Sequence, residues 1–218
     1  MNPAFPGSPD HIAIVETWTR GWAVAREVPS IPVWESGGIK TEVGWADQKT
    51  RYVFPYLNDE FVQLMKVIKE PWVSLKTCAD PEDVKKVLQH RWVIQQVGYM
   101  MTYSGPPIIK PELQKEYILD ITEKKLVTIV KVLTLNGELA SIGRTAIIND
   151  YVVYDRVETN NLHQRKGLAS IVMRTLEAIA ASRGKTKGIL VATDQGKKLY
   201  ETLGWKLHSL YTSVVIPG

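Results

Sequence analysis

The sequence predicts a protein of the α+β class, a mixed α/β fold whose central sheet is mostly antiparallel. Three features lead to this prediction. Strand-like segments with alternating β-branched residues follow one another in the second half, joined by the turn pairs Asn136-Gly137 and Asn149-Asp150. An amphipathic helix over 167–182 comes directly after them. A short apolar strand at 188–193 and a second helix complete the pattern.

The elements of the second half can be assigned in order. Alternation predicts strands at 126–135, 138–148 and 151–159, which the short turns make into an antiparallel meander. The helix that follows ends at Arg183-Gly184, because a cation and a glycine are typical of a helix C-terminus. After the apolar strand, a helix is expected at 195–203 and a final strand or hairpin at 205–216. The predicted order is β-β-β-α-β-α-β.

The first half has a less regular pattern. Asp80 is suited to cap a helix that has Pro81 at its first position. Gly105-Pro106-Pro107 breaks the chain, so we expect an N-terminal α/β region, 1–108, and a second domain, 109–218. The elements expected in the first half are helices at 16–26, 59–69 and 80–90, and strands at 39–45, 51–55, 72–77 and 92–103.

The two halves share a pattern that suggests an internal repeat. In the first half, the strand 72–77 is followed by an Asp-led helix and then Trp92. In the second, the strand 189–193 is followed by an Asp-led helix and then Trp205. No glycine loop precedes the helix at 59–69, so the first half is either a degenerate copy of the second or similar by coincidence.

Composition places the chain among ordinary globular proteins. Its 218 residues fit one large domain or two small ones, with 44% hydrophobic and 23% charged residues. Cys78 is the only cysteine, which excludes a disulfide framework and favours a reducing compartment. The first eleven residues lack the pattern of a signal peptide, and no apolar run is long enough to span a bilayer. We therefore expect a cytoplasmic protein without a membrane partner.

The net charge of +4 lies entirely in the second half. Residues 1–110 hold 12 basic and 12 acidic side chains, and residues 111–218 hold the remaining 15 basic and 11 acidic ones. Surface lysines account for such an excess, and attraction of a polyanionic ligand is the functional alternative. Because there is no dense basic run and no interleaving of arginines with aromatic residues, a nucleic-acid partner is not expected.

The segment 163–169 is the strongest functional signal. It connects the strand 151–159 to the amphipathic helix and contains Gly167 near the start of that helix. Unpaired N–H groups and the positive end of the helix dipole converge at such a start, so an anion such as a pyrophosphate binds there readily. Glycine lets the backbone approach the ligand closely, because it has no Cβ.

Two sequence motifs carry a family resemblance. Gln164-Arg165-Lys166-Gly167-Leu168-Ala169 matches a Q/R-x-x-G-x-G/A loop between a strand and a helix, and Leu199-Tyr200 followed by Gly204-Trp205 matches a second signature. On these motifs the C-terminal half, about 110–218, resembles the GNAT superfamily of acyl-CoA-dependent N-acetyltransferases. The chain departs from the pattern at three positions. Thr193 replaces a frequent asparagine, Gly196 replaces the usual alanine, and Val153 stands where some members hold a glutamate base.

The resemblance implies a GNAT-like fold with a bifurcated pair of neighbouring strands, the family's fourth and fifth. The pantetheine arm of acetyl-CoA, the co-substrate, would lie between them. The resemblance further implies that main-chain groups near Val157 and Thr159 pair with the pantetheine amides, and that Tyr200 acts as general acid for the thiolate leaving group. The residues implied to bind the cofactor are Val157, Thr159, Gln164, Arg165, Lys166, Gly167, Leu168, Ala169 and Thr193.

The proton acceptor is less defined. Asp155 is the best titratable candidate, because strand alternation would place it on the same face as Val153 and Val157. It is equally well explained as a surface or ion-paired aspartate, and a base from the first half, or water, remains open. His163 adjoins the loop, where a lone histidine is more often a polar surface residue. The other histidines, at positions 11, 90 and 208, show no ligand spacing with one another or with Cys78, so we expect no metal site.

The sequence therefore predicts an acyltransferase that moves acetyl from acetyl-CoA to a primary amine of a small molecule or peptide. The alternative is a CoA-binding sensor or partner-binding module that has lost catalysis, which Val153 and Thr193 favour. Trp18, Trp22 and Trp45 belong either to the core or to an acceptor pocket. The acceptor and the oligomeric state are not defined by the sequence, and a homodimer is left open.

Overall fold

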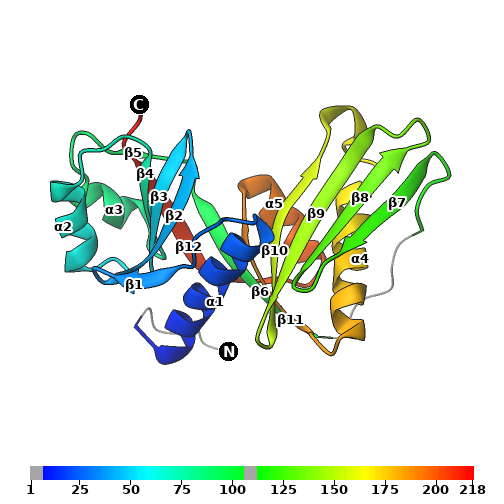
Figure 1. Ribbon diagram of the computed structural model, residues 1–218, viewed down its shortest axis with the longest axis horizontal. Coiled ribbons are helices and arrows are strands. Elements are labelled where there is room, and N and C mark those ends of the chain that lie inside the picture. The colour runs from blue at the N-terminus through cyan, green and yellow to red at the C-terminus, as the bar shows by residue number, and fades with distance from the viewer. Residues whose placement is uncertain (1–6, 106–111) are drawn as a thin grey trace.

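The structure is a computed structural model that describes residues 7–105 and 112–218. One twisted sheet runs through it in the order β1-β2-β3-β4-β12-β6-β11-β10-β9-β8-β7, with β5 paired to β12 (Figure 1). The strands are β1 (Val33–Glu35), β2 (Gly38–Trp45), β3 (Gln48–Phe54), β4 (Val73–Thr77), β5 (Val93–Ile94), β6 (Gly98–Ser104), β7 (Tyr117–Glu123), β8 (Val127–Thr134), β9 (Leu139–Ile148), β10 (Tyr151–Thr159), β11 (Lys187–Ala192) and β12 (Lys206–Val215). The helices are α1 (Pro9–Ala25), α2 (Asp59–Val67), α3 (Pro81–Val87), α4 (Leu168–Ser182) and α5 (Asp194–Thr202).

The predicted fold class is confirmed, and the meander β8-β9-β10 is antiparallel as expected. Two strands were not predicted, β1 and β7, and these are the two outer strands of the sheet. Most residues of both strands are not buried on either face, so their sequences lack the alternation of apolar and polar residues that predicts a strand. The expected strand 92–103 is two strands, β5 and β6, and the segment 205–216 forms one strand and no hairpin.

Helix α1 begins seven residues earlier than predicted, at Pro9 instead of residue 16. The Ser8 side chain accepts a hydrogen bond from the His11 N–H, and Pro9 occupies the first turn. Both features favour a helix start at this position. The predicted cap of α3 is confirmed, because the Asp80 side chain accepts from the Glu82 N–H.

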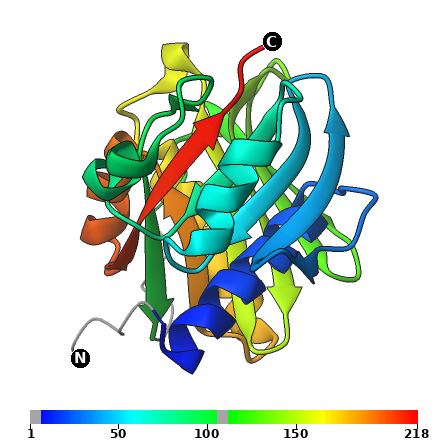
Figure 2. The ribbon, with the colours of Figure 1, turned by 90° about the vertical axis from the view of Figure 1, so that its left-hand side faces the viewer.

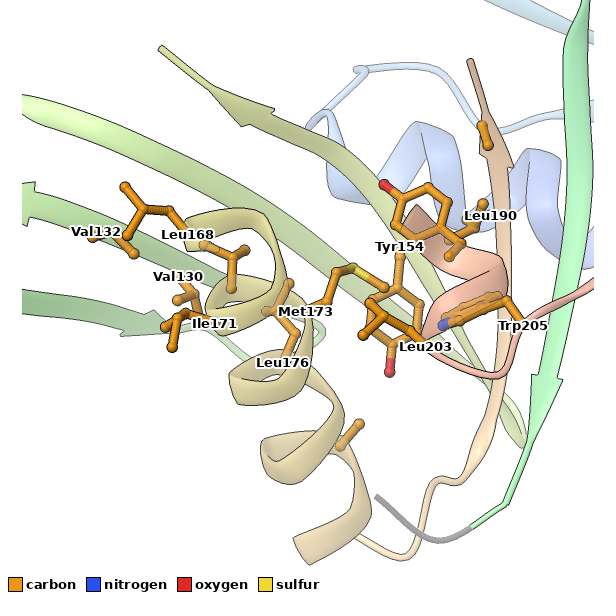
Figure 3. Close-up of a cluster of buried hydrophobic side chains, with 14 of the residues drawn as sticks. Val130, Val132, Tyr154, Leu168, Ile171, Met173, Leu176, Leu190, Leu203 and Trp205 are labelled. Carbon is orange, nitrogen blue, oxygen red and sulfur yellow. The ribbon is translucent and has the colours of Figure 1, made fainter. Parts of the chain in front are cut away.

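The helices cover the two faces of the sheet unequally. Helix α1 packs on one face, where Trp18 and Trp22 join a core with Val153 and Ile189. The other four helices pack on the opposite face, and Figure 2 shows α2 lying over the strands of the N-terminal half. The core under α4 includes side chains from the helix and from β8, β10, β11 and the segment after α5 (Figure 3). The labelled residues of this core are Val130, Val132, Tyr154, Leu168, Ile171, Met173, Leu176, Leu190, Leu203 and Trp205.

The two halves have matching topologies and exchange one strand each. In the first half β3 and β4 are parallel neighbours connected through α2, and in the second β10 and β11 are parallel neighbours connected through α4. After β4 and α3 come the short β5 and then β6, which pairs with β11, whereas the strand after β11 and α5 is β12, which pairs with β4. This correspondence is what a degenerate repeat predicts.

The two halves are therefore joined by continuous strand pairing at β12 and β6. The expected break at Pro106-Pro107 lies outside the described residues, and the division into 1–108 and 109–218 stays a prediction. Within the described ranges, none of the helices is both long and apolar enough to cross a membrane.

Candidate functional site

The strands β10 and β11 separate partway along their length. They pair in parallel at three positions only, from Tyr151 opposite Lys187 to Val153 opposite Ile189. Beyond this point β10 contains a bulge between Asp155 and Glu158, where Arg156 has a φ of 50°. A bulge bends a strand and increases its twist. The equivalent strands of the first half, β3 and β4, pair over five positions, so they leave no comparable opening.

The glycine loop reaches the opening from the end of β10. Gly167 occupies the N-cap of α4 with a φ of 74°, a left-handed conformation that glycine adopts without strain, and its position has no side-chain cap. The Gly167 carbonyl accepts from the Ile171 N–H, so α4 starts directly after it. The first N–H groups of a helix have no carbonyl within the helix to bond, and here no side chain takes their place. These groups and the helix dipole suit an anion.

The outer side of the loop is held by β7. The hydroxyl of the buried Tyr117 lies 2.9 Å from Nδ1 of His163 and accepts a hydrogen bond of 2.9 Å from the Lys166 ammonium. Gln114 also donates its side-chain amide to the Lys166 carbonyl. These contacts orient the loop, so its inner side faces the opening between the strands. Sequence analysis missed Tyr117, because β7 was not predicted.

A cleft of about 710 Å³ lies between β10, β11, the glycine loop and α5. Every residue predicted to take part in catalysis or cofactor binding lines it except Lys166, whose side chain points to Tyr117. Thr193 caps α5 by accepting from the Gly196 N–H at 3.2 Å. Lining residues from the prediction are Asp155, Val157, Thr159, Gln164, Arg165, Gly167, Leu168, Ala169, Thr193 and Tyr200.

Tyr200 lies on α5 with its side chain in the wall of this cleft. It is 7% exposed, and its ring packs near Trp205, with ring centroids 6.1 Å apart. Burial raises the pKa of the Tyr200 hydroxyl well above its usual value, and the nearby negative charge of Asp155 raises it further. The hydroxyl therefore carries its proton at neutral pH, as a proton donor requires.

Asp155 is ion-paired with Arg26, which follows the last residue of α1. Its two carboxylate oxygens accept hydrogen bonds from the Arg26 guanidinium at 2.6 and 3.0 Å. The expectation that Asp155 shares a face with both Val153 and Val157 is wrong. Val153 packs against α1, and Asp155 lies on the same face because it contacts Arg26 at the end of α1. Val157 packs on the opposite face, near α4. The bulge in β10 reverses the alternation between Asp155 and Val157.

Val153, at the position where some family members hold a glutamate, is fully buried under α1. Helix α1 crosses β10 at Gly21, where an added Cβ would stand within 2.5 Å of the Val153 side chain. This close approach leaves no room for solvent or for a side chain as long as glutamate at position 153. The valine therefore serves the packing of α1 against the sheet.

A second cleft, of about 490 Å³, opens on the α1 face of the sheet. It shares Arg26, Asp155 and the segment 191–193 with the first cleft, so the two meet where β10 and β11 separate. Trp18 and Trp22 line it as well as contributing to the core, whereas Trp45 is not among its lining residues.

The second cleft also contains two cations that sequence analysis did not identify, Arg51 on β3 and Lys76 on β4. Each lies in a strand that was predicted. However, a lone basic residue in a strand looks like a solvent-facing position unless the covering helix is known.

No cluster of three or more His, Cys, Asp or Glu side chains suited to a metal ion occurs in residues 7–105 and 112–218. Cys78 is buried, and burial raises the pKa of its thiol to about 12. This thiol is therefore not ionised near neutral pH and is not suited to be a nucleophile.

Comparisons with known proteins agree with this geometry. Residues 97–205 match the acetyltransferase (GNAT) family, a segment that begins just before β6 and ends just before β12. No curated protein matches the sequence.

Solved structures with the same fold cover nearly the whole chain. A GCN5-related N-acetyltransferase from Kribbella flavida has a TM-score of 0.64 at 13% identity, over 94% of this chain and 96% of that protein. A GCN5-related N-acetyltransferase from Sphaerobacter thermophilus has a TM-score of 0.59 at 11% identity, over 84% and 78%. A tandem GNAT protein from the clavulanic acid biosynthesis pathway has a TM-score of 0.52 at 11% identity, over 65% and 63%. At identities this low, the structural similarity establishes the fold alone.

The family match covers half of the chain and includes the glycine loop, the separated strands and Tyr200. The predicted resemblance is thereby confirmed, and the matching topology of the first half agrees with a degenerate second copy. This chain belongs to the GNAT family of acetyltransferases.

Proposed function

We propose that the protein transfers an acetyl group from acetyl-CoA to a primary amine by direct attack of the amine on the thioester. The observation that supports this most is the separation of β10 from β11, with the glycine loop at one end and Tyr200 in the wall. An open channel through a sheet exposes unpaired main-chain groups on both strands. Such groups suit an elongated ligand with amides along its length, as pantetheine has.

In this proposal each part of the first cleft has one role. The N–H groups of residues 164–169 bind the pyrophosphate, and main-chain groups near Val157 and Thr159 pair with the pantetheine amides. The acceptor nitrogen attacks the thioester carbonyl carbon, a C–N bond forms, and the C–S bond breaks. Tyr200 gives its proton to the sulfur as the thiolate leaves, and the Tyr200 oxygen regains a proton from the attacking nitrogen as that nitrogen becomes the amide. Acetyl transfer changes no oxidation state, so the reaction needs no oxidant or reductant.

Asp155 remains our proposal for the acceptor of the proton that the attacking ammonium must lose. It lies at the junction of the two clefts, where an amine from the α1 face would meet the thioester. A carboxylate offers about four lone-pair sites, and the two hydrogen bonds from Arg26 leave others available. The single buried cysteine also leads us to propose a cytoplasmic location.

The site is tested by Gly167→Glu, which places bulk and negative charge at the proposed pyrophosphate position. Acetyl-CoA should raise the melting temperature of the wild-type protein and leave that of Gly167→Glu unchanged. Gly184→Glu is a matched control, because Gly184 ends the same helix with a φ of 71° and, like Gly167, has open space around its Cβ position. If Gly167→Glu responds to acetyl-CoA as Gly184→Glu does, the pyrophosphate site is misplaced.

A catalytically inactive CoA-binding sensor or partner-binding module is the second candidate. Two observations favour it: Val153 is buried at a position where other members hold a base, and Asp155 is already ion-paired. Thioester cleavage with a broad panel of small-molecule and peptide amines separates the two functions. Acetyl-CoA binding without turnover of any amine would favour the sensor. Acetylated product, identified by mass spectrometry, would establish the enzyme.

A further inference from the structure

The second cleft contains an excess of buried positive charge. Arg51 is 4% exposed and Lys76 is 8% exposed. Arg51 donates from Nη2 to the Tyr211 hydroxyl at 2.8 Å, whereas its Nε is buried and has no hydrogen-bond partner. The Lys76 ammonium donates to the Ser213 hydroxyl at 3.0 Å. Within the two described ranges, no carboxylate lies at ion-pair distance from either cation.

The acidic residue of the cleft does not balance this charge. Asp155 is engaged by Arg26, a third cation in the same wall. Burying an unpaired ion is unfavourable, and Arg51 and Lys76 are two such ions in the wall of one cleft. Burial, together with the charges of Arg51 and Arg26, lowers the pKa of Lys76 well below its usual value. An anionic ligand would supply the missing opposite charge and would favour the protonated form of Lys76.

The guanidinium of Arg51 is held in a fixed orientation. Its central carbon lies 3.9 Å from the ring centroid of Trp22 and 4.8 Å from that of Trp18. Cation–π contacts of this type attract a guanidinium and hold its plane in place. Three glutamine side chains also line the cleft, Gln48, Gln95 and Gln96. The cleft thus offers oriented N–H donors, which is what a planar anion such as a carboxylate requires.

Arg51 and Lys76 line a cleft that adjoins the expected site of the reaction. Because the two clefts share Arg26, Asp155 and residues 191–193, a molecule in the second cleft would lie next to the place where the thioester is expected. Resting on the proposed function, we propose that the acceptor is an amino-acid-type amine whose carboxylate binds Arg51 and Lys76. Diamines, aminoglycosides and lysine side chains within a peptide lack such a carboxylate and would be poor acceptors.

Two substrate sets test this proposal. The first compares α-amino acids with their carboxamides and with the corresponding decarboxylated amines. The second keeps a two-carbon amine and varies the other end: β-alanine, taurine, O-phosphoethanolamine, ethanolamine and ethylenediamine. We expect kcat/KM for the best carboxylate to exceed that of its carboxamide by about 100-fold or more, since the carboxamide leaves buried cations unpaired. Equal rates for the acid and its carboxamide would overturn the proposal, and a preference for the phosphate or sulfonate would overturn the assignment to a carboxylate.

Substitutions of Arg51 and Lys76 test whether these two residues cause the preference for a carboxylate. Arg51→Met and Lys76→Met should each reduce the preference for the acid over its carboxamide to below about tenfold. They should do so mainly through KM of the acid, with KM for acetyl-CoA unchanged. Lys86→Met removes an exposed lysine on α3 and should keep the full preference. Lys76→Met is an independent variant if Arg51→Met fails to fold. Losing acid and carboxamide activity in equal proportion in both variants would contradict the proposal.

A binding experiment separates this proposal from the proposed function. Calorimetry on the CoA-loaded protein measures binding of the same acids and carboxamides without any turnover. If no amine is acetylated but acids bind and Arg51→Met abolishes that binding, the acetyltransferase proposal fails and the anion site stands. If amines are acetylated but acids bind no better than carboxamides, the anion site fails and the enzyme stands.

Discussion

At the scale of single residues, the position of Tyr200 decides what it can do. Its hydroxyl lies in the wall of the first cleft, and burial keeps it protonated by raising its pKa. Tyr200→Phe removes the proton and keeps the ring. A thiol has a pKa of about 8.5, so its thiolate is a fairly good leaving group and needs only moderate help from an acid. We therefore expect kcat to fall by about 10- to 100-fold and KM for acetyl-CoA to change by less than about twofold. Steady-state kinetics with a single amine measures both.

Tyr103→Phe is the control, because the Tyr103 ring also packs near Trp205, at 5.6 Å, from outside this cleft. It should retain wild-type kcat. Asp155→Asn belongs to the same series and should lower the rate most at pH values where the amine is largely protonated. Full activity of Tyr200→Phe at all pH values would remove this hydroxyl from the reaction.

The residues that prediction missed have a common property. Arg26, Arg51, Lys76 and Tyr117 are polar side chains whose partners are distant in sequence: Asp155, Tyr211, Ser213 and Lys166. A local pattern carries no signal for such pairs. The residues of the glycine loop were predicted because a loop and a helix start are local features.

At the scale of elements, helix α1 is positioned by a close contact. Gly21 allows the helix to approach β10 at Val153, and Gly21→Ala would force the two apart. Overpacking of this kind costs about 1–3 kcal/mol, against about 1 kcal/mol gained from the better helix propensity of alanine. We expect a lower free energy of unfolding, measured by urea denaturation, and weaker binding in the second cleft, because α1 supplies Trp18, Trp22 and Arg26 to it.

The double variant Gly21→Ala/Val153→Ala provides the internal control. Removing the valine methyl groups relieves the shortest of these contacts, that with Cγ2, while the Cβ of residue 153 stays at 2.5 Å, so part of the lost stability should return. The coupling energy from the double-mutant cycle should exceed about 0.5 kcal/mol. Strictly additive effects of the two substitutions would mean that α1 is not held at this contact.

At the scale of the whole molecule, the exchanged strands make the two halves interdependent. The fragment 109–218 lacks β6, which separates β11 from β12, and the fragment 1–108 lacks β12, the neighbour of β4. Each fragment alone would expose unpaired strand edges, so we expect neither to give a cooperative unfolding transition. Mixed and refolded together, they should form a 1:1 complex in which acetyl-CoA again raises the melting temperature.

Circular dichroism and size-exclusion chromatography check both statements. The position of the cut, between residues 108 and 109, lies outside the described ranges, so it interrupts no described element. A C-terminal fragment that folds cooperatively and binds acetyl-CoA by itself would make the two regions separate domains in the strict sense.

A histidine pair also connects distant parts of the molecule. Nδ1 of His11, on α1, lies 2.9 Å from Nε2 of His208, on β12, and the rings stack at 5.0 Å. Burial, together with the charge of the neighbouring His11, lowers the pKa of His208 to about 4. Between this value and the usual 6.5, the unfolded chain binds more protons than the folded one. The free energy of unfolding therefore falls as the pH falls through this window.

Melting temperatures at pH 7 and pH 5 test this linkage, since each kcal/mol corresponds to about 2–4 °C in a chain of this length. His208→Phe keeps a ring for stacking and removes the titrating group, so its melting temperature should depend less on pH than that of the wild type. His90→Phe, at an exposed position, should leave the dependence unchanged. Equal slopes for wild type and His208→Phe would show that His208 does not contribute.

The sequence by itself determined the α+β class, the meander, the helix starts at Asp80 and Gly167, and the family resemblance that the match over residues 97–205 confirms. All of these follow from interactions between residues close in the chain, such as turns, caps and amphipathic spacing. The prediction from strict alternation failed at Val157, because a bulge in β10 breaks the two-residue repeat of the strand.

Only the tertiary structure decided where the two clefts meet and what lines the second one. The exchange of β6 and β12, the cover of α1 over the sheet, and the burial of Arg51 and Lys76 all depend on contacts between segments far apart in the chain. Amphipathic spacing shows which face of an element is buried, but hydrophobic burial has no preferred direction, so the spacing does not show which distant segment covers that face.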